Sequence, residues 1–458
     1  MKILFYNWDK IDGHVGGGVT VYQRNLVKYL LREDKDNIYV LNSGYSYNVG
    51  GKLTIKQISN EISDKVKTFE IFNSPVLAPV QQSILNVRYY LEDTTLYDLM
   101  KTFIKSVGGF DVIHFNNIEG LSLSVLKLKE DFPNIKFIYS LHNYFPICTM
   151  VSLWNIQKNC NCRADNYNEC AECHKYMSYH AVSCMRKFFG YFRGAGRIAK
   201  LFGRVLPEHD DIDLYKRFEE KNVEYINKYI DATLAVSQRV KDIFVAKGFD
   251  EKKMHVSYIG TAVAENQRYE SCANINSKPF KIIYMGYMTP PKGFYFFLDV
   301  LKKMPNDMAK NISVTVVAKH FKFFHVREIR ALNRLKNKFN EVNLINGYKH
   351  EEQQQLLQDK HLGVVPVLWE DNLPQVAMEQ IAYGVPVLCS DLGGASELSD
   401  HNPAFTFKAG NINDFISKLR KIIKNRQLLQ DFWKTVKPLT TMPQHVEFLR
   451  KVYNDSIH

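Results

Sequence analysis

LGVVPVLWEDNLPQVAMEQIAYGVPVLCSDLGGASEL, residues 362 to 398, is the stretch that decides the fold. Its pattern predicts a buried strand from Leu362 to Leu368, a turn, a helix that ends at Gly384, and a second apolar strand from Val385 to Cys389. Together these form a βαβ unit. In open α/β sheets, ligands bind beyond the carboxyl ends of the strands. The stretch therefore predicts an α/β protein with a binding site after its first strand.

Polar groups gather at that predicted strand end. Glu370 and Asp371 follow the strand, Pro374 lies in the turn, and Glu379 lies on the helix. The free backbone N–H groups at a helix start suit a phosphate. Carboxylate oxygens accept hydrogen bonds from hydroxyl groups. These two chemistries side by side predict a site for a sugar nucleotide.

In this stretch the chain resembles the retaining glycosyltransferases of the GT-B fold, in glycosyltransferase family four. That family has an acidic residue, seven intervening positions and a glutamate, followed by Gly-x-Pro, a strand and Gly-Gly. Asp371 and Glu379 have this spacing, and Gly384-Val385-Pro386 and Gly393-Gly394 follow. The family usually has glutamate at the first position, so Asp371 is a departure; Glu370 could substitute through a small shift of the turn. The resemblance implies two Rossmann-like domains facing a central cleft.

The length and patterning of the chain also predict two domains. At 458 residues the chain is too long for one ordinary core, and domains of about 200 residues are expected. Strands and helices alternate over residues 1–261 and again over 280–439, while 262–279 is polar and aperiodic and is interpreted as a linker. By resemblance, residues 440–458 form a helix that returns to the N-terminal domain. Strands are predicted at 2–7, 39–44, 111–117, 137–143, 232–237 and 255–260, and at 280–286, 312–318, 344–347, 362–368, 385–389 and 404–407.

Two features of the N-terminal half are candidates for binding. Gly16, Gly17 and Gly18 follow the first strand, and glycines let the backbone approach a phosphate or a sugar. The dinucleotide pattern GxGxxG is absent, and a tight turn without a ligand is the alternative. The resemblance implies that Gly17 and Gly18 face the donor phosphates and the acceptor. It also places His142 in the donor sugar site, although a structural core histidine is the competing interpretation; His114 is interpreted as structural.

Lys292 is the candidate cation of the site. It lies in GYMTPPKG, between a predicted strand and helix, where a lysine can neutralise a diphosphate leaving group. The family commonly has an arginine and a lysine here, and this chain has Tyr287 at the arginine position. Lys292 must then hold more of the charge, or Lys319 or His320 must help.

The resemblance assigns the remaining donor contacts. Glu379 would bind the ribose hydroxyls, and Asp371 the hydroxyls of the transferred sugar. The backbone N–H groups of Asn372 and Leu373 would cover the diphosphate. The alternatives are a helix-stabilising acid for Asp371 and a solvated helix face for Glu379.

The expected reaction is transfer of a hexose-type unit from a nucleoside diphosphate sugar to a glycan or a lipid-linked acceptor, with retention at the anomeric carbon. His142, Asp371 and Lys292 are the predicted catalytic residues. No carboxylate stands out as a nucleophile, so positioning and charge stabilisation would dominate, and no catalytic metal is expected. Two rival interpretations remain open: a non-catalytic nucleotide- or glycan-binding relative, and a sugar-nucleotide epimerase.

The cysteines form a second constellation. Cys160 and Cys162 are followed by Cys170 and Cys173, with Cys148 upstream, in a polar, loop-like stretch. Paired cysteines at short spacing suit tetrahedral zinc, and a segment without its own core gains from such a staple. Structural zinc held by Cys148, one or both of Cys160 and Cys162, Cys170 and Cys173 is predicted. Free thiols and a disulfide are the alternatives.

Charge and hydropathy suggest where the protein works. The net charge is +12, and residues 185–204 interleave basic and aromatic side chains without an acid. Such a segment suits an anionic membrane surface, and a buried helix with a basic solvent face is the alternative. No RNA-binding signature is found, so no nucleic-acid partner is expected. No apolar run reaches the roughly 18 residues of a spanning helix, and the N-terminus lacks signal-peptide features. A cytoplasmic protein, peripheral at the inner face of the membrane, is the expectation.

Overall fold

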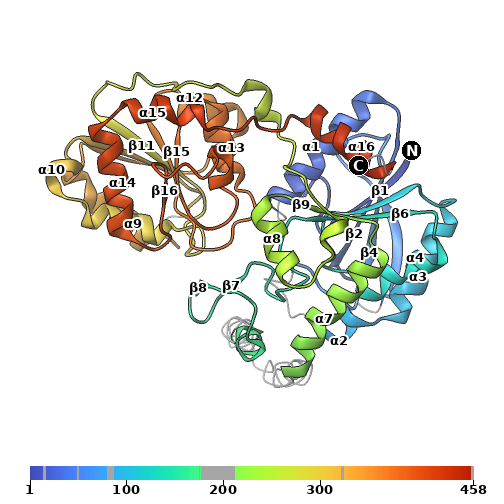
Figure 1. Ribbon diagram of the computed structural model, residues 1–458. Helices are drawn as coiled ribbons and strands as arrows, with labels where there is room; N and C mark the ends of the chain where they lie inside the picture. Colours follow the sequence, from blue (N-terminus) through green and yellow to red (C-terminus); the bar gives the residue numbers. More distant parts are fainter. Residues whose placement is uncertain are drawn as a thin grey trace.

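The computed structural model describes residues 1–13, 17–48, 51–79, 87–174, 176, 212–320 and 324–454. The chain forms two α/β domains, each built on a mainly parallel sheet with helices against it (Figure 1). This confirms the predicted fold class. Parallel sheets covered by helices are buried on both faces, which explains the continuous apolar runs of the strands in the sequence.

The N-terminal domain contains an eight-stranded sheet of order β10-β9-β6-β5-β1-β2-β4-β3, parallel except for the β3–β4 pair. Its strands are β1 (Lys2–Tyr6), β2 (Asn37–Ser46), β3 (Thr54–Ile58), β4 (Lys67–Phe72), β5 (Val112–Phe115), β6 (Lys136–Leu141), β9 (Ala232–Ala235) and β10 (Met254–Val256). Its helices include α1 (Gly17–Glu33), α2 (Val87–Leu91), α3 (Thr94–Ser106), α4 (Leu128–Asp131), α7 (Ile212–Tyr229) and α8 (Gln238–Ala246).

The C-terminal domain contains a six-stranded parallel sheet of order β13-β12-β11-β14-β15-β16. Its strands are β11 (Phe280–Met285), β12 (Ile312–Val317), β13 (Glu341–Ile345), β14 (Leu362–Val365), β15 (Val387–Ser390) and β16 (Thr406–Phe407). Its helices are α9 (Phe294–Lys303), α10 (Asn306–Ala309), α11 (Val326–Arg334), α12 (Gln353–Leu357), α13 (Gln375–Ala382), α14 (Ile412–Lys424) and α15 (Gln427–Asp431).

Besides small differences in strand ends, an edge hairpin and one helix differ from the sequence-based expectation. The edge hairpin of β3 and β4 was not predicted, because β3 mixes polar and apolar residues on a half-exposed sheet edge. The helix expected over 85–107 is interrupted after Leu91. Asp93 caps α3, since its carboxylate accepts a hydrogen bond from the Leu96 N–H at 2.7 Å.

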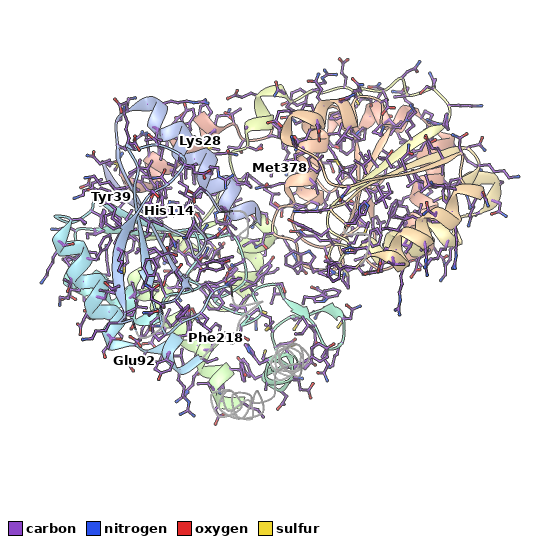
Figure 2. The ribbon with its side chains drawn as sticks, turned by 180° about the vertical axis from the view of Figure 1, so that it is seen from behind. Lys28, Tyr39, Glu92, His114, Phe218 and Met378 are labelled. Atoms are coloured by element: carbon purple, nitrogen blue, oxygen red, sulfur yellow. The ribbon has the colours of Figure 1, made fainter. Side chains whose placement is uncertain are left out.

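The last helix, α16 (Met442–Tyr453), lies against α1 of the N-terminal domain, as its red ribbon beside the blue elements shows (Figure 1). A capping box at Thr441 and Gln444 starts this helix. Arg450 pairs with Glu33 and Asp36, each at 2.7 Å. Inside the domain, Tyr453 bonds Nδ1 of His114, a residue labelled in Figure 2. The chain thus crosses between the domains twice.

A small hairpin follows β6 and His142 in the chain. It consists of β7 (Trp154–Asn155) and β8 (Cys160–Asn161), and it lies at the edge of the N-terminal domain below α8 in Figure 1. The predicted membrane-binding segment 185–204 lies outside the described residues. In the part of the chain that the structure describes, no helix combines the length and the apolar character needed to cross a bilayer.

Candidate active site

A cleft of about 600 Å³ opens between the two domains. Its C-terminal wall is formed by the residues that follow β11, β12, β13 and β14, and its N-terminal wall by α1 and the ends of β6 and β9. Pockets for small ligands usually measure about 300–1,000 Å³. The cleft therefore has the size of a ligand site, and it lies where a parallel sheet binds ligands.

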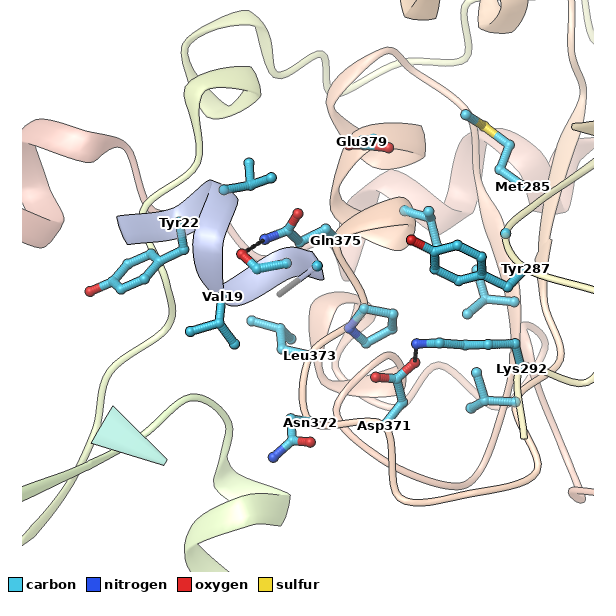
Figure 3. A pocket seen from close by; sticks show the side chains of 18 of the residues that line it. Val19, Tyr22, Met285, Tyr287, Lys292, Asp371, Asn372, Leu373, Gln375 and Glu379 are labelled. Carbon is cyan, nitrogen blue, oxygen red and sulfur yellow. Dashed lines mark hydrogen bonds and ion pairs between the residues drawn. The ribbon is translucent and has the colours of Figure 1, made fainter. Parts of the chain in front are cut away.

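Lys292 and Asp371 meet in the cleft (Figure 3). The Lys292 ammonium lies 2.7 Å from the Asp371 carboxylate and 5.0 Å from the centre of the Trp369 ring. Asp371 is buried, and Lys292 is about one-third exposed at 32%. A lysine held between a carboxylate and an indole face is oriented before any ligand arrives.

Asn372, Leu373 and Glu379 also line the cleft. Asn372 and Leu373 lie in the turn before α13, and the Asn372 Nδ2 donor is buried without a hydrogen-bond partner among the described residues. Glu379, in the second turn of α13, accepts a hydrogen bond from the Tyr348 hydroxyl at 2.8 Å. The helix start, the buried amide and the carboxylate therefore share one wall.

Gly17 and Gly18 face that wall from the N-terminal domain. Gly17 begins α1 with a φ of 61°, a conformation that favours glycine. The Gly18 carbonyl accepts a hydrogen bond from Gln375 Nε2 at 3.2 Å, and a Cβ on Gly18 would lie only 3.3 Å from that nitrogen. Gln375, the first residue of α13, thus links the two walls (Figure 3). Gly16 lies outside the described residues.

His142 lines the cleft from the end of β6. The centres of its ring and the Tyr22 ring lie 4.7 Å apart with the ring planes tilted by 49°, and its Nε2 has no hydrogen-bond partner among the described residues. Burial, together with the nearby His445, lowers the pKa of His142 to about 3. The imidazole is therefore neutral at pH 7, so it can donate one hydrogen bond to a hydroxyl but carries no charge to offset a phosphate.

Glu370 has a different place from the one expected. It is not among the residues that line the cleft, and its carboxylate pairs with Arg239 of the N-terminal domain at 2.9 and 2.5 Å. The Gly393 N–H donates to the same carboxylate at 3.1 Å. In this structure Glu370 therefore makes a contact between the domains, and its role as a donor contact stays a prediction. Asp371 remains the acid that faces the cleft.

A second carboxylate strengthens this contact. Glu397 accepts hydrogen bonds from the backbone N–H groups of Gln238 and Arg239 at 2.9 and 2.7 Å, and from the Tyr258 hydroxyl at 2.8 Å. A buried acid of the C-terminal domain thus caps the start of α8 in the other domain. Glu397 and Arg239 were missed by sequence reasoning, because their partners are more than a hundred residues away.

Lys319 and His320, the two side chains expected to assist Lys292, lie in different places. Lys319 lines the cleft, as does Tyr287, whose side chain extends beside Lys292 and is exposed (Figure 3). His320 does not line it; its ring bonds the Ala318 carbonyl at 2.8 Å. Arg24 is a lining cation that was not anticipated, and its guanidinium bonds the carbonyls of Ile11 and Gly13.

Buried histidines should make the protein sensitive to acid. Burial lowers the pKa of His114 to about 3 and that of His445 to about 4. Because both folded-state pKa values lie below the unfolded value of about 6.5, their stabilising effect is complete above that pH and is lost as the pH falls towards 4. Between pH 7 and 5 the free energy of unfolding should fall by about 2 kcal/mol for each histidine. Urea unfolding at pH 7, 6 and 5 measures this loss.

A histidine variant provides the control for that measurement. His114→Gln should remove about half of the loss in unfolding free energy that the two histidines cause between pH 7 and 5. This holds whatever the stability of the variant at pH 7. An unchanged slope in the variant, or no loss of stability in the native protein by pH 5, would contradict the expectation.

Comparisons with known proteins bear on the fold and on the C-terminal half of the chain. The model of the family "Glycosyl transferases group 1" matches residues 266–437, which include the C-terminal domain. A search among curated proteins finds no match. Among solved structures, the chain is similar to Alr3699/HepE from Anabaena in complex with UDP, at 14% identity over 100% of both chains with a TM-score of 0.60.

Two further solved structures share the architecture over nearly the whole chain. Sucrose-phosphate synthase from Thermosynechococcus elongatus is 14% identical over 99% of this chain and 98% of its own, with a TM-score of 0.63. The lipopolysaccharide outer core galactosyltransferase WaaB is 12% identical over 100% of both chains, with a TM-score of 0.59. The fold is thus the GT-B arrangement of two Rossmann-like domains.

Proposed function

We propose that the protein is a glycosyltransferase that moves a hexose-type sugar from a nucleoside diphosphate sugar to a glycan or lipid-linked acceptor, with retention at the anomeric carbon. The observation that carries the proposal is the Lys292–Asp371 pair beside the start of α13, in a cleft between two domains. The match of residues 266–437 to group 1 glycosyl transferases supports it. So do the similar structures described with UDP and with UDP-glucose.

The cleft supplies the interactions that such a donor needs. Lys292 would neutralise the diphosphate, together with the backbone at the start of α13. Glu379 would accept hydrogen bonds from the ribose hydroxyls, and Asp371 from the hydroxyls of the transferred sugar. Asn372 Nδ2 and His142 Nε2 are buried and unpartnered among the described residues, and each is satisfied if it contacts bound sugar or phosphate.

In the proposed reaction, the bond between the anomeric carbon and the diphosphate oxygen breaks as an acceptor hydroxyl attacks from the same face. The departing nucleoside diphosphate takes the electron pair of that bond, and the acceptor hydroxyl passes its proton to the departing diphosphate oxygen. Lys292 would stabilise the charge that grows on the leaving group. Because no carboxylate stands out as a nucleophile in the sequence, positioning of the acceptor hydroxyl would do the rest. We expect no catalytic metal.

A donor panel tests the proposal. Purified full-length protein should release UDP or GDP from at least one nucleotide sugar, and isothermal titration calorimetry should detect binding of the same nucleotide. Folded protein that neither binds nor turns over any donor would refute the function. Binding without turnover would favour the non-catalytic relative, which Tyr287 and Asp371 at unusual positions motivate; a new nucleotide sugar formed without acceptor would favour an epimerase.

A further inference from the structure

Tyr348 brings a hydroxyl group to the Glu379 carboxylate from a different part of the C-terminal domain. Strand β13 ends at Ile345, and Tyr348 follows in the next loop, where it lines the cleft. Its hydroxyl donates to Glu379 Oε2 at 2.8 Å, and Glu379 extends from α13 (Figure 3). The carboxylate that we assign to the ribose hydroxyls therefore has a partner within the protein.

Apolar packing holds the ring of Tyr348 in place. The ring packs against a small buried cluster that includes Met285 and Val317, the last residues of β11 and β12. Val376 of α13 packs against the same cluster. Packing of this kind restricts a side chain to its low-energy rotamers. The position of the Tyr348 hydroxyl relative to α13 is therefore set by the domain before any nucleotide arrives.

The Glu379 carboxylate gains from such a partner. Glu379 is only 6% exposed, and a buried carboxylate is costly to keep charged unless it accepts hydrogen bonds. The last torsion of a glutamate side chain is broad, so a carboxylate without a fixed partner samples many orientations. Because the Tyr348 hydroxyl holds Oε2, it also orients the plane that contains both oxygens.

The Tyr348 hydroxyl keeps its proton at neutral pH. Burial, together with the charge of Glu379, raises the pKa of this hydroxyl well above the ordinary tyrosine value. An ionised carboxylate only accepts hydrogen bonds, so the hydroxyl is the donor of the pair. A hydrogen bond to a charged acceptor is stronger than one between neutral groups. The pair is therefore suited to fix the orientation of Glu379.

We propose that Tyr348 is a positioning residue for the donor: its hydroxyl fixes the Glu379 carboxylate so that both ribose hydroxyls of a nucleoside diphosphate can donate to it. The cleft would then distinguish a ribonucleotide from its deoxy forms, because a nucleotide without these hydroxyls leaves the buried carboxylate unpaired on that side. Tyr348 takes no part in bond breaking and acts through Glu379. This role presupposes the proposed function, since it requires a nucleotide in the cleft.

Calorimetric titrations with UDP and GDP test this role. Tyr348→Phe removes the hydroxyl and keeps the ring that packs against the buried cluster. The dissociation constant of the nucleotide that binds native protein should rise about tenfold, as expected for the loss of one hydrogen bond to a charged group. With the 2′,3′-dideoxy form of the same nucleotide, native protein and variant should agree within about twofold, because the hydroxyls assigned to Glu379 are absent.

Tyr295→Phe is the matched control. The Tyr295 hydroxyl also donates to a glutamate of the same domain, Glu328, at 3.0 Å, but neither residue lines the cleft. Its removal should change the dissociation constant of the nucleotide by less than about twofold. Equal losses in Tyr295→Phe and Tyr348→Phe would show a general effect on the domain and overturn the positioning role.

Steady-state kinetics adds a readout that a purely structural role would not give. In Tyr348→Phe, KM for the donor should rise by about the same tenfold while kcat changes much less, since the ribose lies away from the bond that breaks. Unchanged nucleotide binding in Tyr348→Phe, or an equal loss with the dideoxy nucleotide, would overturn this role and leave the proposed function standing. Native protein that binds neither UDP nor GDP would refute the proposed function, and the role of Tyr348 with it.

Discussion

Replacement of Lys292 by alanine is expected to lower kcat for sugar transfer by about 10²- to 10³-fold, the usual cost of removing one charge-stabilising group from a transition state. The Lys292 ammonium lies 2.7 Å from Asp371 and over the Trp369 ring, at the cleft wall where we place the diphosphate. Since charge grows on the leaving group as the bond breaks, kcat should suffer more than KM. Steady-state kinetics with the donor identified in the panel measures both.

Lys281 offers a matched control for this variant. Its ammonium pairs with Asp359 at the same 2.7 Å, and its side chain is 34% exposed, against 32% for Lys292. It belongs to the same domain but does not line the cleft. Lys281→Ala should therefore leave kcat within about twofold, because a half-exposed ion pair contributes little beyond local stability. Equal losses in the two variants would refute the assigned role of Lys292.

Replacement of Gly293 by alanine should destabilise the C-terminal domain by more than about 4 kcal/mol. Losses of this size are typical of severe steric or backbone defects. Gly293 has a φ of 73°, and a Cβ there would lie 1.7 Å from the Pro366 carbonyl oxygen. That oxygen belongs to the backbone after β14 and cannot rotate away. Relief of the overlap would separate α9 from the strand end, and Lys292 from Asp371 with it. Urea unfolding of the variant measures the loss.

Gly410 separates the two causes of that destabilisation. It has the same φ of 73°, but nothing lies within 4 Å of a Cβ at this position. Gly410→Ala should cost only the conformational penalty of about 1–2 kcal/mol. The difference between the variants then reports the contact with Pro366. Similar unfolding free energies for both would show that α9 can move away from the strand without cost.

Much of the C-terminal domain could be predicted from local pattern. The apolar runs at 280–286, 312–318 and 362–368 form β11, β12 and β14, each slightly shorter than expected. Strand ends in a parallel sheet share one edge, so Lys292 and Asp371 could be expected to lie together although 79 residues separate them. The N-terminal edge hairpin escaped prediction because a half-exposed strand has weak alternation.

The sequence by itself determined the two βα series, the loops that follow their strands and the acidic and basic groups on those loops, because periodicity and turn residues act over short distances. Only the tertiary structure decided which of two nearby residues in the sequence faces the cleft and which makes another contact. Glu370 pairs with Arg239 while Asp371 faces the cleft, and Cys162 is half-buried while Cys160 is exposed. Residues one or two positions apart point in different directions, and their partners come from distant segments whose positions follow from packing of the whole chain.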